Sequence, residues 1–159
     1  MMKVSIRNFF LASAGVLLFV TSLAKLLSAV GNMRILQTPD PIIGISFREL
    51  FWLVGISEFV VAFICFYSRN YVLRVGLVAW LATNILLYRV GLSLVHYEKP
   101  CSCLGTLTDA LHIPPQTADN IMKIILAYLL IGSYASLFWL WRQRQTAVAT
   151  PTAVATPAQ

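Results

Sequence analysis

Long apolar runs alternate with short polar stretches along this chain. Four runs, 9–30, 50–67, 71–94 and 121–141, consist mainly of aliphatic and aromatic residues. A membrane hydrocarbon layer about 30 Å thick is crossed by roughly 20 helical residues. The pattern therefore predicts an all-α integral membrane protein, a four-helix bundle formed by one domain over 8–141.

Composition agrees with this pattern and narrows the class of protein. Of the 159 residues, 58% are hydrophobic and only 11% are charged. Soluble domains carry about a quarter charged residues, so the lipid bilayer is the first expected partner. The formal net charge of +6 comes from bases that flank the apolar runs, so we expect no nucleic-acid partner.

A cleaved signal peptide is the competing interpretation of the first run. Lys3 and Arg7 precede the run, and the small residues Ser28 and Ala29 lie near its end. However, a signal core spans about 7–15 apolar residues, and this run is longer and contains Lys25. We expect a helix that is retained.

The distribution of bases predicts an N-in/C-in orientation. Orientation follows mainly the number of Lys and Arg residues in short loops. With both termini in the cytoplasm, the inner bases are Lys3, Arg7, Arg69, Arg74, Arg142 and Arg144. The outer bases are Arg34, Arg48, Lys99 and Lys123, mixed with Asp40, Glu49, Glu98, Asp109 and Asp119. The connection between the third and fourth helices then lies outside, which is the periplasm if the membrane is a bacterial inner membrane.

The polar stretches predict how the helices connect. Residues 31–48 form the first outer loop, where Pro39-Asp40-Pro41 disfavours helix. The short inner link 68–70 predicts that the second and third helices are antiparallel neighbours. Residues 142–159 contain TAVATP twice in tandem and no large core-forming segment, so we expect a disordered cytoplasmic tail.

Three ionisable residues fall inside the apolar runs: Lys25, Glu58 and Arg89. Charges at membrane depth are costly and usually face the bundle interior or a partner, so Glu58 is expected to pair with Lys25 or with Arg89. The alternative for the two bases is that their long side chains snorkel to the interface. Helical spacing places other polar residues on the same helix face as each base. In the first run these are Thr21, Ser22 and Ser28 with Lys25, and in the third they are Ser93 and His96 with Arg89.

The stretch YEKPCSCLG, residues 97–105, places Cys101 and Cys103 one residue apart. In an extended strand such residues lie roughly 6.6 Å apart, whereas a disulfide needs Cβ atoms about 3.5–4.5 Å apart. Closing this pair requires a bent backbone, which Pro100 and Gly105 permit, and the small ring would be strained. Strain makes a disulfide more oxidising and more easily exchanged, which predicts disulfide transfer and not a structural cross-link.

Neighbouring residues could tune these thiols. Lys99, His96 and His112 would lower a thiol pKa, whereas Glu98 would oppose them. Two other interpretations stay open. His96, Cys101, Cys103 and His112 could hold zinc or copper, although their spacing matches no strong metal motif and we assign no metal. Alternatively, the cysteines stabilise a packed loop or pair with a partner chain without turnover. The third cysteine, Cys65, is expected to be a buried apolar residue near the inner side.

Several of these features together resemble the MauE branch of the DoxX-like membrane proteins, which includes methylamine-utilisation MauE and redox-associated relatives. The features that carry this resemblance are the four apolar runs, the lysine of SLAKL (Lys25), an acidic residue in the second run, and Cys101-Ser102-Cys103-Leu104-Gly105. The resemblance covers about 8–141. The family motif usually reads CGCFG, so Ser102 and Leu104 depart from it.

The resemblance implies a role in maturing disulfide-containing periplasmic proteins. Cys101, Cys103 and Gly105 would carry over as the redox motif, and Lys25 with either Glu58 or Glu49 as the intramembrane polar positions. It implies a thioredoxin-like or disulfide-containing partner and makes the chain a candidate thiol-disulfide oxidoreductase. A full path for electrons would need a second cysteine pair or direct access to a quinone, so quinone is the candidate cofactor. A non-enzymatic membrane assembly factor and a metal- or small-solute-handling protein are the alternatives.

Overall fold

The computed structural model describes residues 2–31, 34–95 and 114–148. The described chain is helical: α1 (Met2–Val30), the short 3-10 helix η1 (Arg34–Gln37), α2 (Phe47–Tyr67), α3 (Tyr71–Leu94) and α5 (Pro115–Val148). Four helices contain a stretch long and apolar enough to cross a membrane: Asn8–Val30, Phe47–Tyr67, Tyr71–Leu94 and Gln116–Gln143. The predicted all-α architecture with four candidate membrane spans is confirmed.

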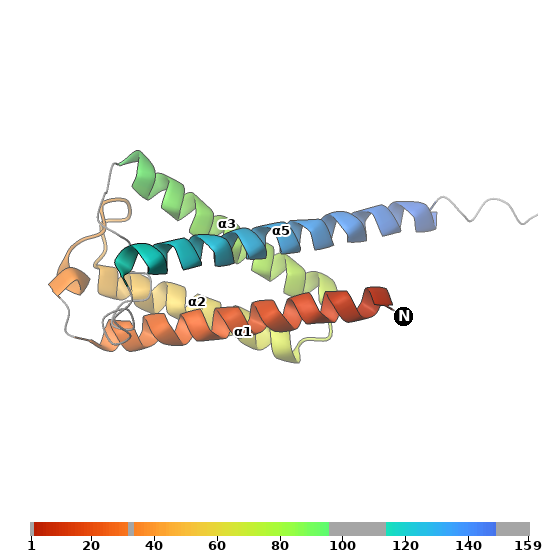
Figure 1. Ribbon diagram of the computed structural model, residues 1–159, viewed down its shortest axis with the longest axis horizontal. Helices are drawn as coiled ribbons and strands as arrows, with labels where there is room; N and C mark the ends of the chain where they lie inside the picture. The colour runs from red at the N-terminus through yellow and green to blue at the C-terminus, as the bar shows by residue number, and fades with distance from the viewer. Residues whose placement is uncertain (1, 32–33, 96–113, 149–159) are drawn as a thin grey trace, which may run out of the picture.

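Successive helices run in opposite directions, which gives the bundle two distinct ends (Figure 1). At one end lie residues 34–46, the last turn of α3 and the first turn of α5; we call this the loop end. The other end carries the start of α1, the 68–70 link and the last turn of α5, and we call it the terminal end. Residues 96–113 therefore leave and rejoin the described chain at the loop end.

Local signals explain where the helices begin. Ser46 caps α2 by accepting a hydrogen bond from the Glu49 backbone, while the Glu49 carboxylate accepts one from the Ser46 N–H at 3.1 Å. This reciprocal capping box satisfies two backbone donors that the helix leaves free. Asn70 caps α3 in a similar way, through the Leu73 N–H. Pro115 opens α5, where its missing N–H and fixed φ are tolerated.

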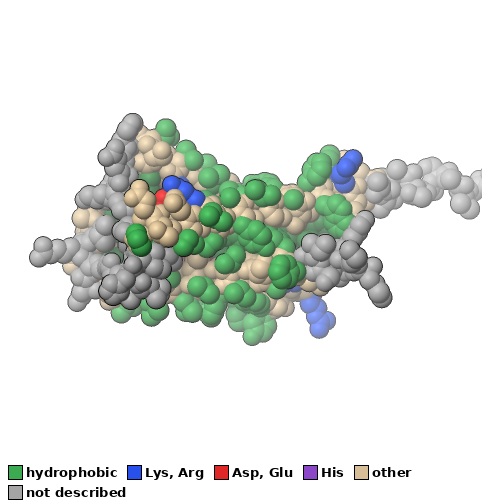
Figure 2. Space-filling model, viewed as in Figure 1, with side chains coloured by type: hydrophobic (Ala, Val, Ile, Leu, Met, Phe, Trp, Pro, Cys, Tyr) green, Lys and Arg blue, Asp and Glu red, His purple; other side chains and the backbone are tan. Residues whose placement is uncertain are grey.

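The apolar core lies where the four helices meet. It contains Phe10, Leu11, Ala14, Leu18, Val61, Ala62, Cys65, Val75, Val78, Leu81, Ala82, Leu126 and Leu129. Most other large apolar side chains face outward, and they cover much of the face in Figure 2. Such an apolar outer surface is compatible with the hydrocarbon of a membrane. The backbone is compatible with it too, because a helix satisfies its backbone hydrogen bonds internally.

The helices associate as two closely packed pairs. α1 packs mainly on α2, and α3 mainly on α5. As predicted, α2 and α3 are antiparallel, but they share only a small contact because α3 leans away from α2 along its length (Figure 1). Gly132 of α5 packs directly on α1: a Cβ there would lie 2.1 Å from Cε2 of the Phe10 ring.

The fourth helix is longer than the sequence predicted at both ends. α5 begins at Pro115, before residue 121, and continues to Val148, past Arg142 where we expected the disordered tail to begin. Gln143, Arg144 and Gln145 are good helix formers, and the Arg142 guanidinium lies 5.9 Å from the centroid of the Phe138 ring. α5 therefore includes residues 142–148, where the predicted tail begins, and 149–159 lie outside the described residues.

Candidate functional site

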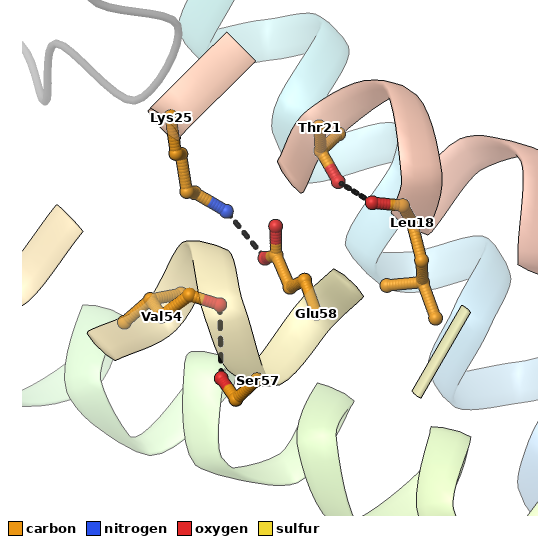
Figure 3. Close-up of polar contacts among 6 residues, drawn as sticks. All are labelled: Leu18, Thr21, Lys25, Val54, Ser57 and Glu58. Carbon is orange, nitrogen blue, oxygen red and sulfur yellow. Dashed lines mark hydrogen bonds and ion pairs between the residues drawn. The ribbon is translucent and has the colours of Figure 1, made fainter. Parts of the chain in front are cut away.

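Lys25 of α1 and Glu58 of α2 form an ion pair inside the bundle (Figure 3). The Lys25 ammonium donates a hydrogen bond to Oε1 of Glu58, and the two residues are 6% and 1% exposed. Of the two partners expected for Glu58, Lys25 and Arg89, it is Lys25 that forms the ion pair. Neither side chain snorkels to an interface; each charge is compensated within the membrane-spanning part, as intramembrane charges generally are.

A glycine allows α1 to approach α2 closely at this pair. Gly55 precedes Glu58 by about one helical turn, and a Cβ at Gly55 would lie 3.0 Å from Cδ2 of Leu26 and 3.5 Å from Cβ of Lys25. A larger residue would therefore push α1 away from α2. The glycine places the two backbones so that the Lys25 side chain reaches the carboxylate.

The polar face predicted for α1 is buried around the ion pair. Thr21, Ser22 and Ser28 are 7%, 0% and 1% exposed. Thr21 donates to the Leu18 carbonyl at 3.1 Å, and Ser28 donates to the Ala24 carbonyl at 2.7 Å. Together with Lys25 and Glu58 they form what we call the polar cluster: Thr21, Ser22, Lys25, Ser28 and Glu58.

Arg89, the third intramembrane charge, has a different acidic partner. Its guanidinium lies 3.1 Å from Oδ1 of Asp119 in the first turns of α5, and Lys123 lies 2.7 Å from Oδ2 of the same carboxylate. The three charges connect α3 to α5 near the loop end. The sequence pattern did not indicate Asp119 as the partner of Arg89, although the spacing of four residues between Asp119 and Lys123 is typical of an ion pair on one helix.

Asp40 holds the loop between α1 and α2 against α3. The carboxylate accepts hydrogen bonds from the Tyr88 hydroxyl and from the Ile42 and Ile43 N–H groups, the last two at 2.8 and 3.0 Å. Burial raises the pKa of Asp40, but these hydrogen bonds outweigh it and hold the pKa below its ordinary value. The Pro39-Asp40-Pro41 sequence predicted a non-helical loop, but it gave no indication of Tyr88 as partner.

The predicted redox motif lies in the part of the chain that is not described. Cys101, Cys103, Gly105, Lys99, His96 and His112 all fall within 96–113, and Ser93, at the predicted base of this segment, is exposed. Cys65 is a free, fully buried cysteine in the last turn of α2, near the terminal end of the bundle. Within 2–31, 34–95 and 114–148, no three His, Cys, Asp or Glu residues are grouped to hold a metal ion.

The described residues therefore offer the ion pair of Lys25 and Glu58 in the bundle interior, and the Arg89–Asp119–Lys123 cluster and the Asp40 loop near the loop end. In hydrocarbon such charges bind one another strongly and would be costly to separate. Comparisons of the chain with protein-family models, with curated proteins and with solved structures find no match.

Proposed function

We propose that this membrane protein takes part in thiol-disulfide exchange, or in the maturation of extracytoplasmic proteins, through Cys101 and Cys103. The observation that carries the proposal is the position of Cys65. The segment that contains the Cys-x-Cys pair joins the bundle at the loop end, whereas Cys65 is fully buried near the opposite end. Cys65 lies about 27 Å along α2 from the start of that helix at the loop end, which supports a role for Cys101 and Cys103 that does not involve Cys65.

The proposed orientation puts the loop end outside the cytoplasm. Within the described chain, six bases lie toward the terminal end: Lys3, Arg7, Arg69, Arg74, Arg142 and Arg144. Three bases lie toward the loop end, Arg34, Arg48 and Lys123, together with Asp40, Glu49 and Asp119. The excess of bases at the terminal end supports an N-in/C-in topology. In a bacterial inner membrane the cysteine pair would then face the periplasm, where disulfides persist.

The chemical step is a dithiol-disulfide exchange. A thiolate of the partner attacks one sulfur of the Cys101–Cys103 disulfide, which forms a mixed disulfide and releases the other cysteine as thiolate. The second partner thiolate then displaces the bound cysteine, so the partner is oxidised by two electrons and the pair is reduced to the dithiol. Return to the disulfide needs an external oxidant, for which a quinone or a thioredoxin-like disulfide protein is proposed.

The test follows the redox state of the pair in growing cells. In a Cys65→Ala background, free thiols are trapped by acid quenching and alkylated with a maleimide that shifts the protein on a gel. We expect a mixture of dithiol and disulfide that shifts when reductant or oxidant is added, and a mixed disulfide with a partner that accumulates in Cys101→Ser or Cys103→Ser.

The opposite result favours a different class of function. A pair that keeps one redox state under all these conditions, in cells where both serine variants support normal maturation of disulfide proteins, would contradict thiol exchange. The protein would then act as a membrane assembly factor that binds partners without turnover.

A further inference from the structure

Two buried oxygen atoms of the polar cluster have no hydrogen-bond partner among the described residues. They are Oε2 of Glu58 and Oγ of Ser22. Glu58 is 1% exposed and Ser22 is 0% exposed, so neither atom reaches the surrounding solvent or lipid headgroups. A buried polar atom left without a partner destabilises a protein, and most such atoms bind another group or an ordered water.

The two atoms are related through Lys25. Ser22 and Lys25 are three residues apart on α1, so they share a face and lie about 4.5 Å apart along the helix axis. Lys25 in turn binds Glu58 through Oε1. Figure 3 shows the interaction of Lys25 with one carboxylate oxygen of Glu58, and no interaction is drawn to the other oxygen.

The chemistry of the cluster defines what could bind there. A carboxylate oxygen paired with an ammonium accepts hydrogen bonds, so a ligand at Oε2 of Glu58 has to be a donor. Ser22 can donate or accept. Because Lys25 already neutralises Glu58, an added cation would be repelled by the ammonium and an added anion by the carboxylate. The ligand is therefore uncharged, and the burial of Ser22, Lys25 and Glu58 requires it to be small.

We propose that Ser22, Lys25 and Glu58 form an internal binding site for a small neutral hydrogen-bond donor, occupied by water in the membrane. Water can donate to Oε2 of Glu58 and exchange a second hydrogen bond with Ser22, which satisfies both atoms. Glu58 follows the start of α2 by about 16 Å of helix, so this water lies well inside the membrane-spanning part. The site does not depend on the proposed thiol chemistry.

Water-edited solid-state NMR on the full chain in lipid bilayers tests the site directly. The chain has three glutamates, Glu49, Glu58 and Glu98, so side-chain carboxyl labelling gives few signals, and loss of one signal in Glu58→Gln assigns it. We expect magnetisation to pass from water to the Glu58 carboxyl as fast as to the exposed Glu49. A transfer as slow as that to the methyl group of Ala62, which is 0% exposed, would overturn the proposal.

Two serine variants on the same helix separate the site from general burial. Ser22→Ala removes a proposed water ligand, so the fast transfer to Glu58 should be lost or clearly slowed. Ser28→Ala removes a buried hydroxyl that bonds to the Ala24 carbonyl at 2.7 Å, and it should leave the transfer unchanged. Equal transfer in wild type and Ser22→Ala would contradict Ser22 as a ligand. If either variant fails to fold, the wild-type comparison of Glu58 with Ala62 still decides whether water is present.

Discussion

Lys25 and Glu58, which come from different membrane-spanning helices, form an ion pair in which both residues are almost fully buried. Forming it requires the desolvation of two charges, whereas removing one partner leaves the other charge uncompensated in the bundle. We therefore expect Lys25→Met and Glu58→Gln each to lower the free energy of unfolding by about 3–5 kcal/mol.

A double-mutant cycle tests this pairing. Denaturant unfolding in mild detergent is measured for both single variants and for Lys25→Met/Glu58→Gln. The double variant should lose much less stability than the sum of the two single losses, because it leaves no unpaired charge. Additive losses would show that the two side chains do not interact in the folded protein.

Gly55 sets the separation of α1 and α2 at the pair. Gly55→Val introduces atoms where a Cβ alone lies 3.0 Å from Leu26, so we expect a loss of about 1–3 kcal/mol. Gly76→Val in α3 is the matched control, since a Cβ at Gly76 has nothing within 4 Å. Unfolding in detergent should show a clear loss for the first variant and a small change for the second; equal losses would reject close packing at Gly55.

The docked loop should make stability depend on pH in the acidic range. The folded pKa of Asp40 lies below its ordinary value of 3.8, so its hydrogen bonds stabilise the protein fully above about pH 4. This contribution is lost as the pH falls through the lower folded pKa. Between pH 7 and pH 3 the melting temperature of wild type should fall, and the fall should be smaller in Asp40→Asn. Identical profiles would contradict a stabilising Asp40 carboxylate.

Tyr88 provides an independent check on the same contact. Tyr88→Phe removes the hydroxyl that donates to the Asp40 carboxylate, and a hydrogen bond to a charged group contributes about 1.5–3 kcal/mol. We expect a loss of that size above pH 5, measured by unfolding in detergent. The loss should nearly disappear in the Asp40→Asn background if the two side chains act as a unit, and it should persist unchanged if they do not.

The two charges that bind Asp119 should differ in their importance. The Arg89 side chain is 16% exposed, whereas the Lys123 side chain is 62% exposed and well solvated. Exposed pairs contribute about 0–1 kcal/mol, so Lys123→Gln should change stability little. Arg89→Gln should destabilise more, because it removes a largely buried ion pair between α3 and α5. A larger effect of Lys123→Gln in the same unfolding assay would contradict this ranking.

The sequence predicted the features that depend on local pattern. Four long apolar runs are sufficient to place four helices, and a short Glu58 inside one of them needs a cation, which limited its partner to Lys25 or Arg89. The sequence could not predict the hydrogen bond between Asp40 and Tyr88 or the ion pair between Arg89 and Asp119. Those contacts depend on how residues 34–46 fold back over α3 and on how α3 leans toward α5, and both are set by packing between distant segments.

The measurement that tests the proposed function most directly is the labelling of cysteines from outside the cell. Intact cells that carry the Cys65→Ala variant are treated with a membrane-impermeant maleimide, with and without prior reductant, and Cys101→Ser and Cys103→Ser identify the labelled thiols. We expect labelling of both Cys101 and Cys103, and we expect reductant to increase it. Labelling that appears only after the cells are opened would contradict the orientation and the extracytoplasmic thiol exchange together.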